Sequence, residues 1–125
     1  MKRLRDAWNE IVAGVETYRE GVATGSPDKW NHGWDRAKLA MLDQFAPSVK
    51  RIEPVEIGDP RVNLYLDDLQ DFVKDWPADG RLFEDRSHDA QVKGYIPIDY
   101  WGVTRDYIAQ AVQGIERAHK AGLLK

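Results

Sequence analysis

The stretch GSPDKWNHGWDRAK, residues 25–38, concentrates two tryptophans, a histidine, two carboxylates and three cations in fourteen positions. Such a mixture is typical of a binding site, but its first four residues are also typical of a helix start. Gly25 stops a preceding helix, and Ser26 can accept hydrogen bonds from the exposed amides of the next one. Pro27 fits a first helical position, and Asp28 favours the positive helix end. We therefore predict a turn between two helices and interpret the stretch mainly as structure.

Apolar side chains recur every three or four residues on both sides of this turn, which predicts two amphipathic helices. The first helix is expected over residues 2–23, with an apolar stripe formed by Leu4, Trp8, Ile11, Val15, Tyr18 and Val22. The second is expected over residues 27–46, with one face formed by Trp30, Trp34, Ala37, Met41 and Phe45. Pro47 should end the second helix, because proline lacks the amide hydrogen that a helix interior needs.

The outer side of this second helix is mixed in character. His32 lies opposite the tryptophans, between Asp28 and Asp35. One imidazole and two carboxylates on a single solvated helix are seldom enough to hold a metal, so we assign no metal ligand. Leu39 and Leu42 also lie toward this side, and we therefore expect the helix to touch something on more than one face.

Two further helices are predicted after a connector at residues 46–59, which should hold one short turn or an extended piece around residues 55–57. A third helix is expected over residues 60–76 and ends at Pro77, with a stripe formed by Val62, Tyr65, Leu66, Leu69, Phe72, Val73 and Trp76. A fourth is expected over residues 100–121, with one face formed by Trp101, Ile108, Val112, Ile115 and His119. It should end at Gly122, with Leu123 placed to fold back.

These four segments predict an all-α fold, a small four-helix bundle-like domain that takes up residues 1–125. A length of 125 residues fits one domain, and 42% hydrophobic residues is enough for a core. Residues 77–98 show no sustained period and form a long connection between helices three and four. Long connections of this kind are often functional.

Several chemistries are excluded or weakly supported. The chain has no cysteine, which removes disulfides, thiolate metal sites and cysteine nucleophiles. No glycine-rich phosphate motif or nucleophilic serine elbow is present, so we assign no catalytic residue and expect no cofactor. The segment Glu116-x-x-His119 occurs only once, and a di-metal bundle would need a second copy. No apolar run approaches the length of a membrane span and no signal sequence is evident, so we expect a cytoplasmic protein.

Charge is the most informative compositional feature. The formal net charge is −3, but residues 53–85 carry ten acidic and three basic side chains, a local balance of −7 against +4 elsewhere. On the third helix, Asp67, Asp71 and Asp75 recur every four residues with Asp68 alongside. Like charges at this spacing repel and aspartate is a mediocre helix former, so the pattern indicates a surface kept for a partner. We predict the partner-binding residues to be Asp67, Asp68, Asp71, Asp75, Glu84, Asp85, Tyr95 and Tyr100.

The function expected from these features is that of a non-enzymatic module that binds another protein through the acidic helix face and the long loop. It would be a regulator, inhibitor or accessory subunit, and its partner would carry a basic surface. One version is occlusion of a nucleic-acid-binding surface by carboxylates that stand where phosphates lie. An alternative is a small enzyme or ligand-binding protein with a pocket under residues 77–98, using His88 or His119 with nearby carboxylates as acid and base.

A weaker alternative is a DNA-associated regulator that works through basic termini. Cations occur near both ends of the chain, at Lys2, Arg3, Arg5, Arg117, Lys120 and Lys125. Six cations on an acidic protein are few for a nucleic-acid-binding surface, so nucleic acid is not the partner we expect. Binding of DNA would be better supported if the two ends of the chain were adjacent. The heptad-like spacing of the first helix would also serve a homodimer.

Overall fold

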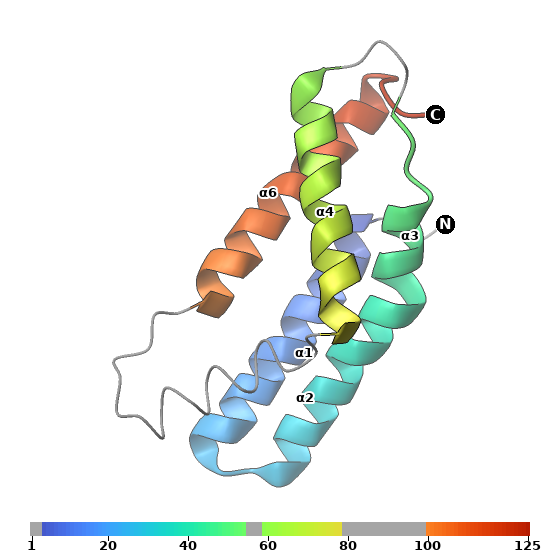
Figure 1. Ribbon diagram of the computed structural model, residues 1–125. Coiled ribbons are helices and arrows are strands. Elements are labelled where there is room, and N and C mark those ends of the chain that lie inside the picture. The colour runs from blue at the N-terminus through green and yellow to red at the C-terminus, as the bar shows by residue number, and fades with distance from the viewer. Residues whose placement is uncertain (1–3, 55–58, 79–99) are drawn as a thin grey trace.

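A computed structural model describes residues 4–54, 59–78 and 100–125, and side-chain surroundings are described for all of these except residues 75–78 and 100. The described chain is all-α, with four long helical segments packed together, as predicted (Figure 1). The elements in order are α1 (Leu4–Thr24), α2 (Pro27–Ala40), η1 (Met41–Phe45), α3 (Ala46–Lys50), α4 (Pro60–Ala78) and α6 (Tyr100–Lys120).

The turn between α1 and α2 has the predicted capping. Gly25 adopts a positive φ of 69°, which glycine reaches without steric cost. The Ser26 hydroxyl accepts a hydrogen bond from the Lys29 amide at 3.4 Å, and Pro27 begins α2. The Ser26 amide donates to the Gly21 carbonyl at 2.8 Å. These contacts close a tight antiparallel hairpin.

Glycines allow α1 and α2 to approach more closely than the apolar stripes alone would suggest. A Cβ atom added to Gly14 would lie 2.6 Å from the backbone nitrogen of Ala37. Similar Cβ atoms on Gly21 and Gly33 would also collide with backbone atoms of the partner helix. The two helices therefore pack backbone against backbone and form the most extensive helix contact in the described fold.

The prediction that Pro47 ends the second helix is wrong. The helical path continues from α2 through the π-helical segment η1 into α3 and ends at Lys50. The Ala46 amide donates to the Met41 carbonyl, five residues back, so the hydrogen-bond register changes before the proline. Pro47 then lies in the first turn of α3, where a missing amide hydrogen is tolerated. The proline shifts the register of the helix instead of stopping it.

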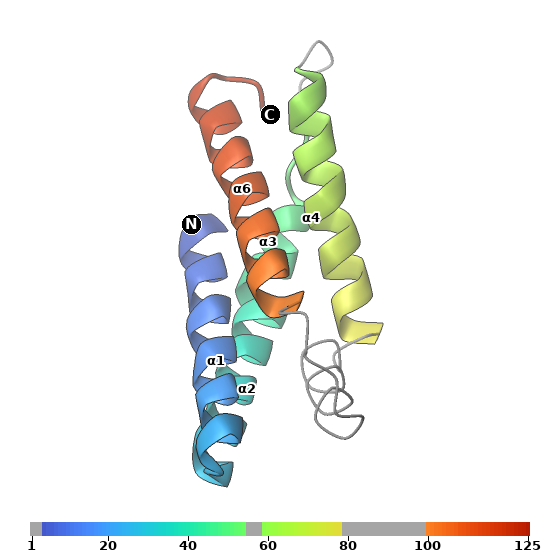
Figure 2. The ribbon, with the colours of Figure 1, turned by 90° about the vertical axis from the view of Figure 1, so that its left-hand side faces the viewer.

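Helices α4 and α6 run antiparallel beside each other and are displaced along the bundle from the α1–α2 hairpin (Figure 2). α4 extends two residues past its predicted end at residue 76, and α6 closely matches its predicted range. At the end of α6, Gly122 has a φ of 77°, and the Leu123 amide donates to the Ala118 carbonyl at 2.9 Å. The predicted fold-back of Leu123 is thereby confirmed.

The core is organised around Trp8. Its ring centroid lies 5.5 Å from that of Phe45, 5.7 Å from that of Phe72 and 6.2 Å from that of Trp101. The four rings come from α1, η1, α4 and α6, so they join all the long segments through large aromatic area. Trp8 and Trp101 are buried as predicted, whereas Trp30 and Trp34 are only half-buried and the side chain of Trp76 lies outside the described residues.

The apolar stripe of α1 is used inside the chain. Trp8, Ile11 and Val15 are all buried in the common core. The heptad-like spacing therefore serves the bundle itself. Across the described ranges, no helix combines the length and the apolar character needed to cross a membrane.

Candidate protein-binding face

The carboxylates of α4 lie on the side of the helix that points away from the core. Val62, Leu66, Leu69 and Val73 are buried, while Asp67 and Asp71 are exposed and Asp68 is half-buried. We call the three aspartates Asp67, Asp68 and Asp71 the acidic face. Asp75 would extend this row by one turn, because it follows Asp71 by four residues, but its side chain lies outside the described residues.

Within the described part of the chain neither Asp67 nor Asp71 makes an ion pair, and exposed Lys74, three residues after Asp71, offsets their charge only in part. The carboxylates of α1 behave differently, and three of them are paired across helices: Glu10 with Arg36 at 3.0 Å, Glu16 with Arg105 at 3.1 Å and Glu20 with Lys29 at 2.9 Å. The acidic face therefore remains available to an external cation.

Asp68 connects the acidic face to α6. It accepts a 2.7 Å hydrogen bond from the Tyr107 hydroxyl, and this bond raises the pKa of Tyr107 because it favours the protonated phenol. Tyr107 is itself 52% exposed. The bond places an aromatic ring at the edge of the carboxylates.

Exposed aliphatic side chains occur on the same two helices. Leu64 of α4 is 62% exposed and Val103 of α6 is 66% exposed. Leu64 lies on the outer side of α4 with Asp67 and Asp71, and Val103 lies one helical turn before Tyr107. Neither Leu64 nor Val103 is among the binding residues predicted from the sequence. Both lie outside the predicted apolar stripes, and an apolar residue outside a stripe is the sequence feature that could have identified them.

Of the eight predicted partner-binding residues, the structure brings Asp67, Asp68 and Asp71 together. The long connection lies outside the described residues, and with it Glu84, Asp85 and Tyr95. Tyr100 begins α6, but its side chain is likewise not described. The described part of the candidate site is therefore the α4 surface and its α6 border.

The histidines do not support a catalytic or metal centre in the described residues. His32 is exposed on the polar side of α2, as predicted. His119 is also exposed, which corrects its predicted place on the core face of α6. The reason is that α1 begins beside Glu116, so the last turn of α6 extends past the start of α1 (Figure 2). His88 lies outside the described residues, and elsewhere no three His, Asp or Glu side chains gather as metal ligands.

The expectation that the second predicted helix touches something on more than one face stays a prediction. Leu39 of α2 is 60% exposed and Leu42 of η1 is 42% exposed, so the described chain leaves both side chains largely uncovered. The inner side of the same helix provides its packing, through Ala37 and Ala40 against the core.

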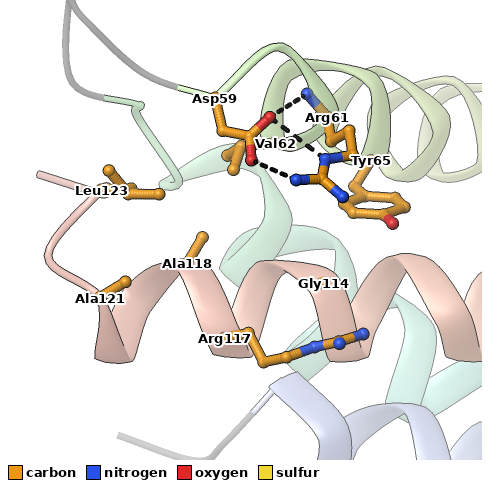
Figure 3. Close-up of a pocket in the computed structure, with 9 residues that line it drawn as sticks. All are labelled: Asp59, Arg61, Val62, Tyr65, Gly114, Arg117, Ala118, Ala121 and Leu123. Carbon is orange, nitrogen blue, oxygen red and sulfur yellow. Dashed lines mark hydrogen bonds and ion pairs between the residues drawn. The ribbon is translucent and has the colours of Figure 1, made fainter.

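A pocket of about 240 Å³ lies between the start of α4 and the end of α6 (Figure 3). Its lining is apolar at Val62, Ala118 and Leu123. At its edge Arg61 binds Asp59, and hydrogen bonds from the Arg61 backbone and side chain lower the pKa of Asp59. The described lining contains no histidine, and it lies at the end of α4 opposite to Ala78. It therefore does not correspond to the acid–base pocket of the alternative hypothesis.

Comparisons with protein-family models, curated proteins and solved structures give no match to this chain. Function must therefore be inferred from its surface.

Proposed function

We propose that this chain is a non-enzymatic protein-binding module that acts as a regulator, inhibitor or accessory subunit. Its acidic face would receive a basic surface of another protein. The observation that supports this role is the contrast between helices: three of the four carboxylates of α1 are paired with cations, whereas Asp67 and Asp71 of α4 are exposed and unpaired within the described residues. The repulsion along α4 costs a few tenths of a kcal/mol per pair, and a bound cation would relieve it.

The apolar border gives the proposed interface a second source of affinity. Exposed charges mainly set the rate of association and its salt dependence, while buried apolar contacts supply much of the binding energy. Leu64, Val103 and Tyr107 offer such contacts next to the carboxylates. A basic partner that also carries an apolar residue would fit this combination.

Occlusion of a nucleic-acid-binding surface is the specific form of inhibition that we propose. Asp67 and Asp71 are separated by one helical turn, about 6 Å along the axis, so a rigid helix presents a regular row of negative charge. A groove that binds phosphates with lysine and arginine would accept such a row. Bound protein would then exclude the nucleic acid by occupying the same cations.

Capture from a lysate of the source cells tests the proposal. The immobilised wild type is compared with D67N/D71N and with D35N/D43N, which removes the same charge from exposed aspartates of α2 and η1. We expect D67N/D71N to lose the retained partner and D35N/D43N to keep it. Retention by the wild type should fall as salt rises from about 50 to about 500 mM, because screening weakens exposed charge contacts.

Two outcomes would contradict the proposal. Equal retention by D67N/D71N and wild type would remove the acidic face as the binding surface, and salt-independent retention would remove the electrostatic mechanism. The occlusion version has its own test, in which excess duplex DNA should release the captured partner. A partner that stays bound while it holds DNA would reject occlusion but not binding.

A further inference from the structure

Basic side chains without ion pairs collect at one end of the bundle. Eight of the described cations make no ion pair with a described residue, and only Lys38 and Lys74 of these lie elsewhere, on α2 and α4. The other six form what we call the basic end: Arg5, Lys50, Arg51, Arg117, Lys120 and Lys125. All six are exposed.

The fold joins these residues from distant parts of the chain. The Arg5 amide donates to the Glu116 carboxylate at 3.2 Å, so the start of α1 lies beside the last turns of α6. The Lys125 amide donates to the Glu53 carbonyl at 2.8 Å, and a β-bridge pairs Pro54 with Leu124. This contact attaches the end of the chain to the residues that follow α3. The start of α1, the C-terminal residues and the end of α3 accordingly lie on one side of the bundle (Figure 1).

The charge balance of this end remains positive. Its described carboxylates are Asp6, Glu53, Asp59 and Glu116. Asp59 is already paired with Arg61, and Glu116 is half-buried and accepts the Arg5 amide. With Arg61 included, seven cations at this end therefore face these four side-chain carboxylates, a balance of +3, although the whole chain is acidic.

Helix capping explains only part of this arrangement. Lys50 lies in the last turn of α3, and Arg117 and Lys120 lie in the last turn of α6, where cations offset the helix dipole. Arg5 lies in the first turn of α1, where a positive charge is unfavourable by the same effect. A ligand that brings negative charge would stabilise both sets of cations.

We propose that the basic end binds the phosphate backbone of double-stranded DNA, a role separate from that of the acidic face. Long, exposed lysine and arginine side chains from three helices suit rows of phosphates and need no base contact. Single-stranded binding normally adds aromatic side chains on which bases stack. The aromatic side chain described beside Arg117 is Tyr65, which is half-buried and packs against Gly114, so it is poorly placed to stack on a base and the duplex is the form that we propose.

The affinity should be modest and governed by salt. Non-specific DNA binding typically has a Kd of about 10⁻⁴ to 10⁻⁶ M, and the net charge of −3 opposes it here. If three to five cations reach phosphates, log K should fall against log salt with a slope of about −3 to −5. Sequence preference is not expected, because phosphate contacts carry no base information.

Fluorescence anisotropy with a labelled random duplex of about 20 base pairs tests this inference at about 50 mM salt. The R117Q/K120Q variant should bind about tenfold more weakly and show a salt slope smaller by about 2. K38Q/K74Q removes the same charge away from the basic end and should bind within about twofold of wild type. Far-UV circular dichroism confirms that all variants keep their helices.

Three results would overturn the inference. They are no duplex binding by the wild type, a loss of DNA affinity in K38Q/K74Q equal to that in R117Q/K120Q, or tighter binding of the single strand than of the duplex. The outcome is independent of the protein-binding proposal. D67N/D71N should bind DNA at least as well as wild type, because it removes negative charge, while R117Q/K120Q should still retain the protein partner.

Discussion

Tyr107 of α6 donates a 2.7 Å hydrogen bond to Asp68 of α4, and this contact joins the two helices at the edge of the exposed carboxylates. It gives the acidic face a fixed border, because a tyrosine held by its hydroxyl presents its ring beside the aspartates. A partner of the kind we propose would therefore meet both charge and an apolar contact of defined position at this surface.

We expect the D68N substitution to lower the pKa of Tyr107. The Asp68 carboxylate stabilises the protonated phenol, chiefly through the hydrogen bond, and a neutral amide would do so less well. The stabilisation from this contact is present below the ordinary tyrosine pKa of about 10, and is lost as pH rises through the higher pKa of the folded state. Phenolate absorbance followed during alkaline titration measures the shift, and the difference from Y107F assigns it to this residue. An unchanged Tyr107 titration in D68N would show that the bond does not persist in solution.

We expect the G14A substitution to destabilise the fold although alanine is the better helix former. The added Cβ would lie 2.6 Å from the Ala37 backbone nitrogen, and backbone cannot move aside without separating α1 from α2. Overpacking of this kind costs about 1–3 kcal/mol or more, which exceeds the roughly 1 kcal/mol that alanine gains over glycine in a helix. Urea unfolding measures the change in the free energy of unfolding.

The matched substitution is G114A on α6. The three atoms nearest to its Cβ would all belong to the ring of Tyr65, a side chain that can adjust more easily than backbone. We therefore expect a clearly smaller loss of stability in G114A than in G14A. Equal losses would mean that α1 and α2 are not held at backbone contact.

Periodicity predicted the helices well because burial alone sets the spacing of residues such as Ile11, Leu69 and Val112. Periodicity did not reveal the close contact between Gly14 and the Ala37 backbone. Glycine adds nothing to an apolar stripe, and Ala37 lies on the next helix. Pro47 was misjudged because a π-turn can absorb a missing amide by changing the hydrogen-bond register.

The acidic face was partly predictable for the same physical reason. Asp67 and Asp71 lie off the stripe of α4, and side chains off the stripe are exposed. Their lack of ion pairs was not predictable, since that depends on which helices lie alongside. The contact of Tyr107 with Asp68 spans 39 positions, and the basic end likewise depends on tertiary packing that no local pattern encodes.

We expect W8A to be the most damaging tryptophan substitution among those described. Trp8 is buried and contacts aromatic rings of three other helical elements, so its removal leaves a large cavity. Truncation of a buried tryptophan typically costs about 3–5 kcal/mol. Trp30 is half-buried and provides the comparison, so W30A should lower the free energy of unfolding clearly less than W8A does. Thermal unfolding ranks the two, with W8F as a milder variant if W8A does not fold, and a larger loss in W30A would contradict the central position of Trp8.

Asp59 should contribute a pH-dependent stability to the start of α4. Its Oδ1 atom accepts the Arg61 amide at 2.9 Å and its Oδ2 atom lies 3.3 Å from the Arg61 guanidinium, so the charged form is favoured and the pKa of Asp59 is lowered. The contribution is present above the ordinary aspartate pKa of about 3.9, and it is lost as pH falls through the lower pKa of the folded state. We therefore expect D59N to lower the melting temperature at neutral pH and to match wild type in strong acid. D35N, at an exposed position on α2, should leave the melting temperature unchanged at neutral pH. A D59N deficit that stays constant from neutral pH into strong acid would show that the Asp59 charge does not stabilise this helix start.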